Sequence, residues 1–170
     1  MVSVRPARPS DTEAIVAVNA AGWRVGYRGI VSDARLARLP IARWRSEVRA
    51  GLARPSGDSF SLVGELDRAF AGYCYVAAPA RDGDLGQKVA ELVAIYVEPE
   101  LWASGVGGAL IAAAEREALA RGYEQMSLWT FTENDRARGF YQRRGWRADG
   151  HERVHPLARA TAMRMRKRIG

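Results

Sequence analysis

The sequence predicts an α/β domain built around a mixed sheet. Short runs rich in β-branched and aromatic residues alternate along the chain with stretches of helical periodicity. Their order is strand, two helices, three strands, helix, strand, helix and two strands. No internal repeat or linker-like segment interrupts that order, and 170 residues are enough to bury one core. We therefore expect a single domain over residues 1–170.

The N-terminal part is expected to form one strand followed by helices. Ser10 and Glu13 have the spacing of a capping box, so a helix is predicted to begin directly after Ser10. Pro40 is expected to end a short helix capped by Ser32, because proline cannot continue a helix. The predicted elements are the strand 2–7, the helix Asp11–Ala21, the short helix after Ser32 and the helix Arg43–Leu52.

The middle of the chain is expected to supply three strands. Residues 59–79 read as a hairpin that turns at Leu66–Arg68. After a polar loop, residues 89–97 are mostly apolar and β-branched, which is typical of a central strand buried on both faces. Pro99 stops this strand.

The C-terminal part is expected to alternate helices and strands. A helix runs from three glycines near residue 105 to Arg121, because Val106, Leu110, Ala114 and Ala118 form an i, i+4 row ahead of a C-capping Gly122. The remaining predicted elements are the strand 125–131, the helix 134–144 and the strands 145–154 and 160–168.

The charge balance raises the question of a nucleic-acid partner. The net charge is +7, and nearly all of the cations are arginines. A basic domain can bind nucleic acid, but these arginines are scattered along the whole chain, and the basic C-terminus alternates Met and Arg with the period of a strand. We therefore do not expect a nucleic-acid partner, whereas an anionic small molecule would use such charge at close range.

Composition also argues against metal, disulfide and membrane chemistry. Cys74 is the single cysteine, and His151 and His155 are the two histidines, so we expect no disulfide and no metal site. The longest uncharged run, Leu101–Ala114, has 14 residues and is too short to span a bilayer. The first residues lack the apolar run of a signal peptide, so a cytoplasmic location is expected.

Gly105, Gly107 and Gly108 stand where a helix is expected to begin, although a glycine inside a helix costs about 1 kcal/mol relative to alanine. The lysine of a phosphate-binding Walker loop is missing, and a dinucleotide fingerprint would need its glycines directly after a strand. A third interpretation is a loop whose bare backbone N–H groups approach a pyrophosphate at the helix N-terminus. The alternative is that the glycines only let the helix pack closely on the sheet.

A second pattern near the C-terminus decides between these interpretations. The pattern N-x-x-A-x-x-F-Y-x-x-x-G-F/W is matched by Asn134, Ala137, Phe140, Tyr141, Gly145 and Trp146. With these residues the sequence resembles the GNAT superfamily of N-acetyltransferases. The family's acetyl-CoA loop, [QR]-x-x-G-x-[GA], is matched by Gly105 and Gly107, while Trp102 stands where the family has Gln or Arg.

The resemblance implies a GNAT-like fold whose central strands splay apart, so that free strand backbone can bind the pantetheine arm of acetyl-CoA. The cofactor-binding residues that follow are Ile95, Tyr96, Val97, Gly105, Val106, Gly107, Gly108, Ala109, Asn134, Ala137 and Tyr141.

Two catalytic roles follow from the resemblance. Tyr141 is the candidate general acid for the leaving thiolate, since a phenol can donate a proton as charge develops on sulfur. Glu91 is the candidate general base, because a carboxylate serves at this strand position in some relatives and strand alternation is expected to place it on one face with Val93, Ile95 and Val97.

The implied activity is direct acetyl transfer from acetyl-CoA to a primary amine of a small molecule, peptide or protein. The alternative is a non-catalytic module of the same fold that binds acyl-CoA or a partner protein. An acetylated Cys74 intermediate is disfavoured, because a lone thiol in an apolar strand is usually inert. The acceptor pocket is expected around Trp23, Arg24, Tyr27, Arg28 and Trp44. The acceptor, the acyl-chain preference and the oligomeric state stay open, with a homodimer among the alternatives.

Overall fold

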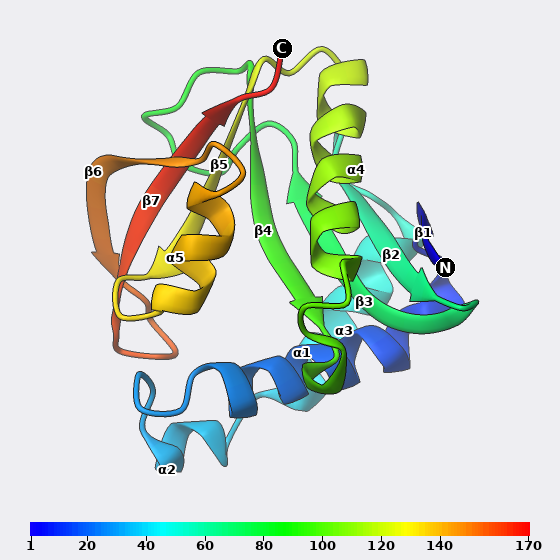
Figure 1. The fold of residues 1–170 in the computed structure, drawn as a ribbon, viewed down its shortest axis with the longest axis vertical. Helices are drawn as coiled ribbons and strands as arrows, with labels where there is room; N and C mark the ends of the chain where they lie inside the picture. The colour runs from blue at the N-terminus through cyan, green and yellow to red at the C-terminus, as the bar shows by residue number, and fades with distance from the viewer.

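The computed structural model describes all residues 1–170 as one seven-stranded mixed sheet with helices on both faces (Figure 1). The strands are β1 (Val2–Pro6), β2 (Phe60–Leu66), β3 (Ala69–Ala77), β4 (Val89–Val97), β5 (Gln125–Phe131), β6 (Arg147–Val154) and β7 (Thr161–Arg168). The helices are η1 (Pro9–Asp11), α1 (Thr12–Gly26), α2 (Asp33–Leu36), α3 (Ile41–Ala53), η2 (Pro99–Leu101), α4 (Val106–Ala120) and α5 (Asp135–Gln142). The predicted fold class is confirmed.

The sheet order is β1-β2-β3-β4-β5-β7-β6, and every neighbouring pair is antiparallel except β4 and β5. These two parallel strands pair only over Val89–Leu92 and Gln125–Leu128. Beyond that stretch the two strands no longer pair with each other, and Figure 1 shows them diverging toward their carboxyl ends. The central sheet is therefore splayed, which leaves the second half of β4 without a strand partner on one side.

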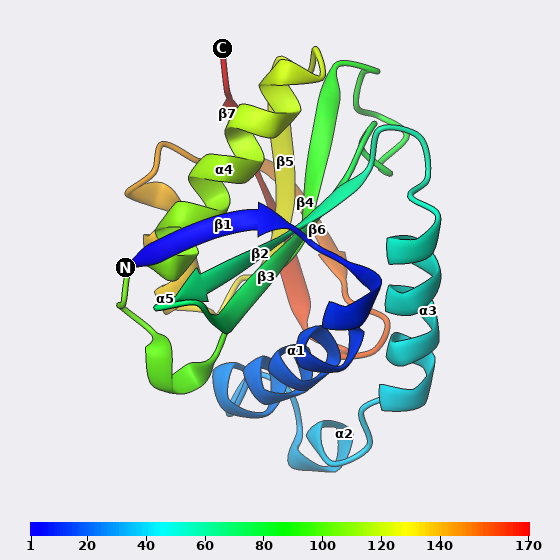
Figure 2. The ribbon, with the colours of Figure 1, turned by 90° about the vertical axis from the view of Figure 1, so that its right-hand side faces the viewer.

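Helices α4 and α5 cover one face of the sheet, and α1 and α3 cover the other (Figure 2). The predicted i, i+4 row of α4 lies in the larger core, where Val106, Leu110, Ala114 and Ala118 are all fully buried. On the opposite face, Ile15 and Val18 of α1 pack against β2 and β3. The amphipathic spacing of both helices thus fixes which face of the sheet each one covers.

Helix α1 begins and ends differently from the prediction. The capping box over Ser10 and Glu13 is wrong, because Ser10 lies inside the short helix η1 and the N-cap of α1 is Asp11, whose side chain makes no capping bond to this helix. The Asp11 carboxylate instead accepts the Arg8 backbone N–H at 2.7 Å and a hydrogen bond from the Arg5 guanidinium at 2.8 Å. The helix also continues to Gly26, five residues past the predicted end at Ala21.

This extension carries α1 across the open end of the splay (Figure 1). The helix approaches β4 at Gly22, where an added Cβ would lie 2.5 Å from the ring of Tyr96. Glycine is therefore needed at this position for the close approach. None of the helices is both long and apolar enough to cross a membrane.

Candidate active site

Two adjoining cavities occupy the region where β4 leaves β5. The larger has a volume of about 450 Å³ and is lined by Ile95, Val97, Leu101, Trp102, Ala103, Gly105, Gly107, Gly108, Arg136, Ala137, Phe140, Tyr141, Arg143 and Arg144. The smaller has a volume of about 100 Å³ and is lined by Gly22, Gly26, Tyr27, Ile95, Tyr96, Val97, Trp102, Thr130, Asn134, Arg136, Ala137 and Tyr141. Because they share part of their walls, an extended molecule can reach from one into the other.

The glycines lie at the N-terminus of α4, on the wall of the larger cavity. Gly105 is the N-cap and has a φ of 94°, a left-handed conformation that favours glycine. A Cβ on Gly107 would meet only ordinary contacts, the nearest at 3.5 Å from the Phe140 ring. Packing therefore does not require glycine at position 107, and its missing side chain leaves room beside the free N–H groups of the first helical turn.

Two residues that the resemblance assigned to this loop do not line the cavity. The side chain of Val106 is fully buried in the core. The backbone N–H of Ala109 already donates to the Gly105 carbonyl at 3.0 Å. In this part of the site, then, Val106 can offer a ligand only its backbone N–H, while the N–H of Ala109 is engaged within the helix.

The exposed half of β4 forms the opposite wall. Ile95 and Val97 line both cavities, whereas Tyr96 lines only the smaller one. The indole N–H of Trp102 donates to the Val97 carbonyl at 3.0 Å. Trp102 thus replaces the polar residue of the family pattern with a side chain that binds the protein's own strand.

Helix α5 brings Tyr141 and Asn134 to the same place. The Oδ1 of Asn134 accepts the Ala137 backbone N–H at 3.1 Å, which caps the helix. Tyr141 lines both cavities, and its ring packs at 5.3 Å from Phe140 and 6.1 Å from Trp146. Burial raises the pKa of the Tyr141 phenol well above its ordinary value, so the hydroxyl keeps its proton at neutral pH.

The predicted position of Glu91 is wrong. Strand β4 contains a bulge, since Val76 of β3 pairs with Leu92 while the adjacent Tyr75 pairs with Ala94. The extra residue reverses the alternation, so that Ile95 and Val97 join the core on the α4 face and Glu91 lies on the opposite face.

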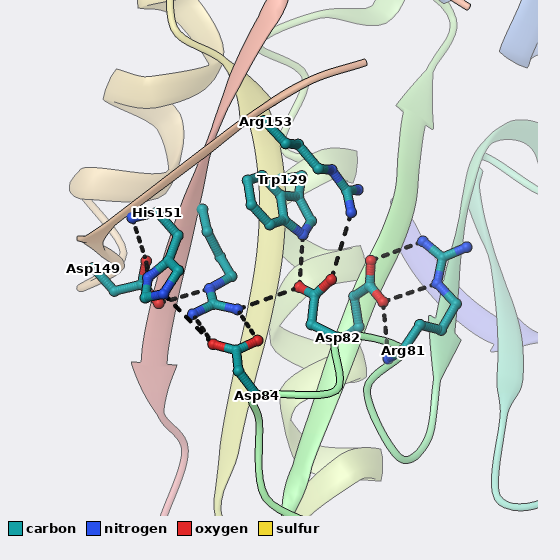
Figure 3. A network of polar contacts seen from close by, with 9 residues as sticks. Arg81, Asp82, Asp84, Trp129, Asp149, His151 and Arg153 are labelled. Carbon is teal, nitrogen blue, oxygen red and sulfur yellow. Dashed lines mark hydrogen bonds and ion pairs between the residues drawn. The ribbon is translucent and has the colours of Figure 1, made fainter. Parts of the chain in front are cut away.

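The Glu91 carboxylate is 2% exposed, and both of its oxygens accept hydrogen bonds from the Arg81 guanidinium, at 2.8 and 2.9 Å. Figure 3 shows Arg81 next to Asp82, and neither Glu91 nor Arg81 lines either cavity. The role of Glu91 as general base stays a prediction.

Three arginines of α5 and the turn after it were not assigned to the site from the sequence. Arg136, Arg143 and Arg144 all line the larger cavity, and the guanidinium of Arg144 lies 3.9 Å from the centre of the Phe140 ring. They occupy unspecified positions of the C-terminal pattern, so the only signal for them was a run of arginines on a helix already placed at the site.

The residues expected around the acceptor separate into two groups. Tyr27 lines the smaller cavity, and Trp23 and Trp44 pack behind it in an aromatic cluster. Arg24 and Arg28 line neither cavity. Cys74 is fully buried, and burial raises the pKa of its thiol to about 12, so it carries no thiolate at neutral pH.

Comparison with known proteins identifies the family of the chain. Residues 30–146 match the sequence profile of the Acetyltransferase (GNAT) family. A mycothiol acetyltransferase from Sanguibacter keddieii is 30% identical over 135 residues, which are 78% of this chain and 39% of that protein. The chain thus spans well under half the length of this relative.

Solved structures resemble the whole chain. The PaiA N-acetyltransferase from Thermoplasma acidophilum, solved in complex with coenzyme A, superposes with a TM-score of 0.81 at 19% identity over 99% of both chains. An N-acetyltransferase from Staphylococcus aureus superposes with a TM-score of 0.76 at 15% identity, over 100% of this chain and 99% of that one. At these sequence identities the structural similarity shows a shared fold and nothing finer.

Proposed function

Because the chain belongs to the GNAT acetyltransferase family, we propose that it transfers an acetyl group directly from acetyl-CoA to a primary amine. The observation that carries this proposal is the convergence of three features on one cavity. These are the free N-terminus of α4, the unpaired half of β4 and the phenol of Tyr141. The pyrophosphate would bind the N–H groups of Gly107 and Gly108, and the pantetheine arm would follow Ile95 and Val97.

The size and charge of the cavity suit this substrate. A volume of about 450 Å³ lies within the usual range for small-molecule sites, roughly 300–1,000 Å³. Arg143 and Arg144 give its outer end positive charge, which favours the phosphates of the donor. Ala137 lines both cavities and would contact the pantetheine arm, while Asn134, which lines only the smaller cavity, would contact the thioester end of the donor where the two cavities meet.

The reaction is nucleophilic substitution at the thioester carbonyl. The amine nitrogen forms a bond to the carbonyl carbon, the carbon–sulfur bond breaks, and sulfur leaves with its electron pair. Tyr141 would give its proton to that sulfur and take up a proton again from solvent. The amine loses one proton during transfer, and if Glu91 accepts it, the proton has to travel through water because Glu91 lies on the other face of β4.

The test is an acetyl-CoA titration by calorimetry followed by a thiol-release assay over amino acids, polyamines, aminoglycosides and peptide N-termini. We expect a binding isotherm with one site per chain and thiol release with at least one class of amine. Binding without release for every amine would favour the non-catalytic module. No heat on titration into folded protein would contradict the cofactor site itself.

A further inference from the structure

The lining of the smaller cavity carries only positive charge. Arg136 is the only charged residue that lines it, and no aspartate or glutamate lines either cavity. A site built to hold a second ammonium group of a polycation would need a carboxylate at hydrogen-bond distance. The cavity lacks this feature, so its electrostatics favour an anion.

Arg136 has no partner of its own within the chain. Its guanidinium carbon lies 3.3 Å from the centre of the Trp102 ring, and loss of hydration lowers its pKa. The neighbouring Arg138, by contrast, donates to the Thr132 carbonyl and to Asp135. A guanidinium stacked by its face keeps its in-plane N–H groups free, which is the geometry that binds a carboxylate through two parallel hydrogen bonds.

Arg136 is exposed, and its guanidinium lies against the Trp102 ring and near α1. Trp102 is fixed by its hydrogen bond to Val97, and an added Cβ on Gly26 of α1 would lie 3.2 Å from the Arg136 Nη2. Gly26 therefore gives the guanidinium the room to lie between α1 and the Trp102 ring.

The remaining polar groups of the smaller cavity are neutral. The hydroxyls of Tyr27 and Tyr96 lie 3.1 Å apart, and burial raises the pKa of both. They can accept a hydrogen bond from an amine without attracting a second positive charge. The nearby Arg136 cation also lowers the pKa of a bound ammonium, because like charges disfavour the protonated form. The site thus promotes the neutral amine that attack on the thioester requires.

We propose that the acceptor is a small zwitterion of the amino-acid class, in which the primary amine and an anionic group belong to one molecule. Arg136 binds the anionic group, a carboxylate, phosphinate or phosphonate, and thereby sets acceptor specificity. A volume of about 100 Å³ is several times the roughly 10–15 Å³ that one water needs, so this cavity has room for the head group while the donor occupies the larger one. This inference rests on the proposed function.

The first experiment compares matched acceptors in the thiol-release assay. Each amino acid of the panel is paired with its own amide, which keeps the amine and removes the negative charge, and spermidine serves as a cationic acceptor. We expect kcat/KM to be about 10- to 100-fold higher for the best amino acid than for its amide, the range for hydrogen bonds to charged groups.

The second experiment tests Arg136 directly. Arg136→Gln should raise KM for the amino acid and reduce the preference over its amide to less than about threefold. Because Arg136 also lines the larger cavity, KM for acetyl-CoA can rise as well, but the acid-to-amide ratio is the quantity that only the anion site changes. Arg136→Glu should reverse the preference in favour of the amide and spermidine. Arg144→Gln is the matched control, because Arg144 lines only the larger cavity: it should weaken acetyl-CoA and leave the acid-to-amide ratio as it is.

The outcomes separate the two proposals. Thiol release that favours spermidine or the amides, or an acid-to-amide ratio that Arg136→Gln leaves unchanged, would overturn the anion site while acetyl transfer stands. No thiol release with any acceptor, despite acetyl-CoA binding, would contradict the proposed function and this inference together. Thermal unfolding of each variant checks that the comparison is made on folded protein.

Discussion

At the scale of the residue, the proposed chemistry depends most on Tyr141. The residue lines both cavities, and burial keeps its hydroxyl protonated. Its ring contacts Phe140 and Trp146, so removal of the hydroxyl alone should leave the packing intact. The role of this one atom can therefore be measured separately from the fold.

Tyr141→Phe is expected to lower kcat by about 100-fold or more, since general acid catalysis typically contributes roughly 10²- to 10⁴-fold. The Kd for acetyl-CoA, measured by calorimetry, should stay within about twofold, because the phenol acts on the leaving sulfur rather than on the anchoring groups. An equal loss in kcat and in acetyl-CoA affinity would assign Tyr141 a binding role instead.

The site residues that could be predicted from the sequence are those whose role depends on a local backbone conformation. Gly105, with its positive φ, and Asn134, the cap of α5, are each specified by local geometry, so a short pattern identifies them. Arg136 and Trp102 are different. Their contact joins two segments that meet only after folding. The family pattern leaves the position of Arg136 unspecified, and at Trp102 the sequence departs from the pattern.

At the scale of the element, β4 determines where the site lies. Most strand and helix limits agree with the periodicity of the sequence to within a few residues, because apolar spacing is a local property. The bulge near Val93 is not local, since it exists only in the register between β3 and β4. The alternation rule therefore gave the wrong face for Glu91, although it gave the right limits for the strand.

The N-terminus of α4 is the second element on which the site depends. Gly107→Val should abolish detectable acetyl-CoA binding in calorimetry, because the new side chain enters the cavity beside the free N–H groups. The fold should persist, since an added Cβ meets nothing closer than 3.5 Å.

Gly51→Val provides the matched control for this variant. Gly51 lies in α3 with nothing within 4 Å of an added Cβ, and the same substitution there should leave the acetyl-CoA Kd unchanged. A folded Gly107→Val protein that binds acetyl-CoA as the wild type does would contradict the assignment of the loop.

At the scale of the whole molecule, an ionic network joins segments that are far apart in the sequence (Figure 3). Arg164 of β7 is 2% exposed and pairs with Asp84 at 2.7 Å, Asp149 at 2.7 Å and Asp82 at 3.5 Å. Asp82 also accepts the indole N–H of Trp129 on β5 at 2.8 Å. These contacts fix the loop between β3 and β4 against the last strands of the sheet.

No sequence motif predicts this network, because Arg164 and Asp84 are 80 positions apart and each is an ordinary charged residue in its own segment. Arg164→Met would remove the one cation shared by all three carboxylates, leaving Asp82 with Arg153 at 3.5 Å and Asp84 and Asp149 with His151. We expect the free energy of unfolding in urea to fall by about 3 kcal/mol or more, as for other buried ion pairs that lose one partner.

Arg43→Met is the control for that loss. Arg43 pairs only with Glu47 on the exposed surface of α3, where solvent screening leaves an ion pair little effect on stability. Similar decreases in the free energy of unfolding of the two variants would show that Arg164 contributes no more to stability than a surface arginine does.

The same network predicts how stability depends on pH. Hydrogen bonds from Arg164 lower the pKa of Asp84 from 3.8 to about 2. A carboxylate whose pKa is lower in the folded state stabilises the fold above its unfolded pKa, and that contribution is lost as the pH falls through the folded value. Asp84→Asn should therefore be less stable than the wild type above about pH 4, and the difference should shrink toward about pH 2. Urea unfolding of both proteins across this range measures the difference, and a gap that does not change with pH would mean that ionisation of Asp84 does not stabilise the network.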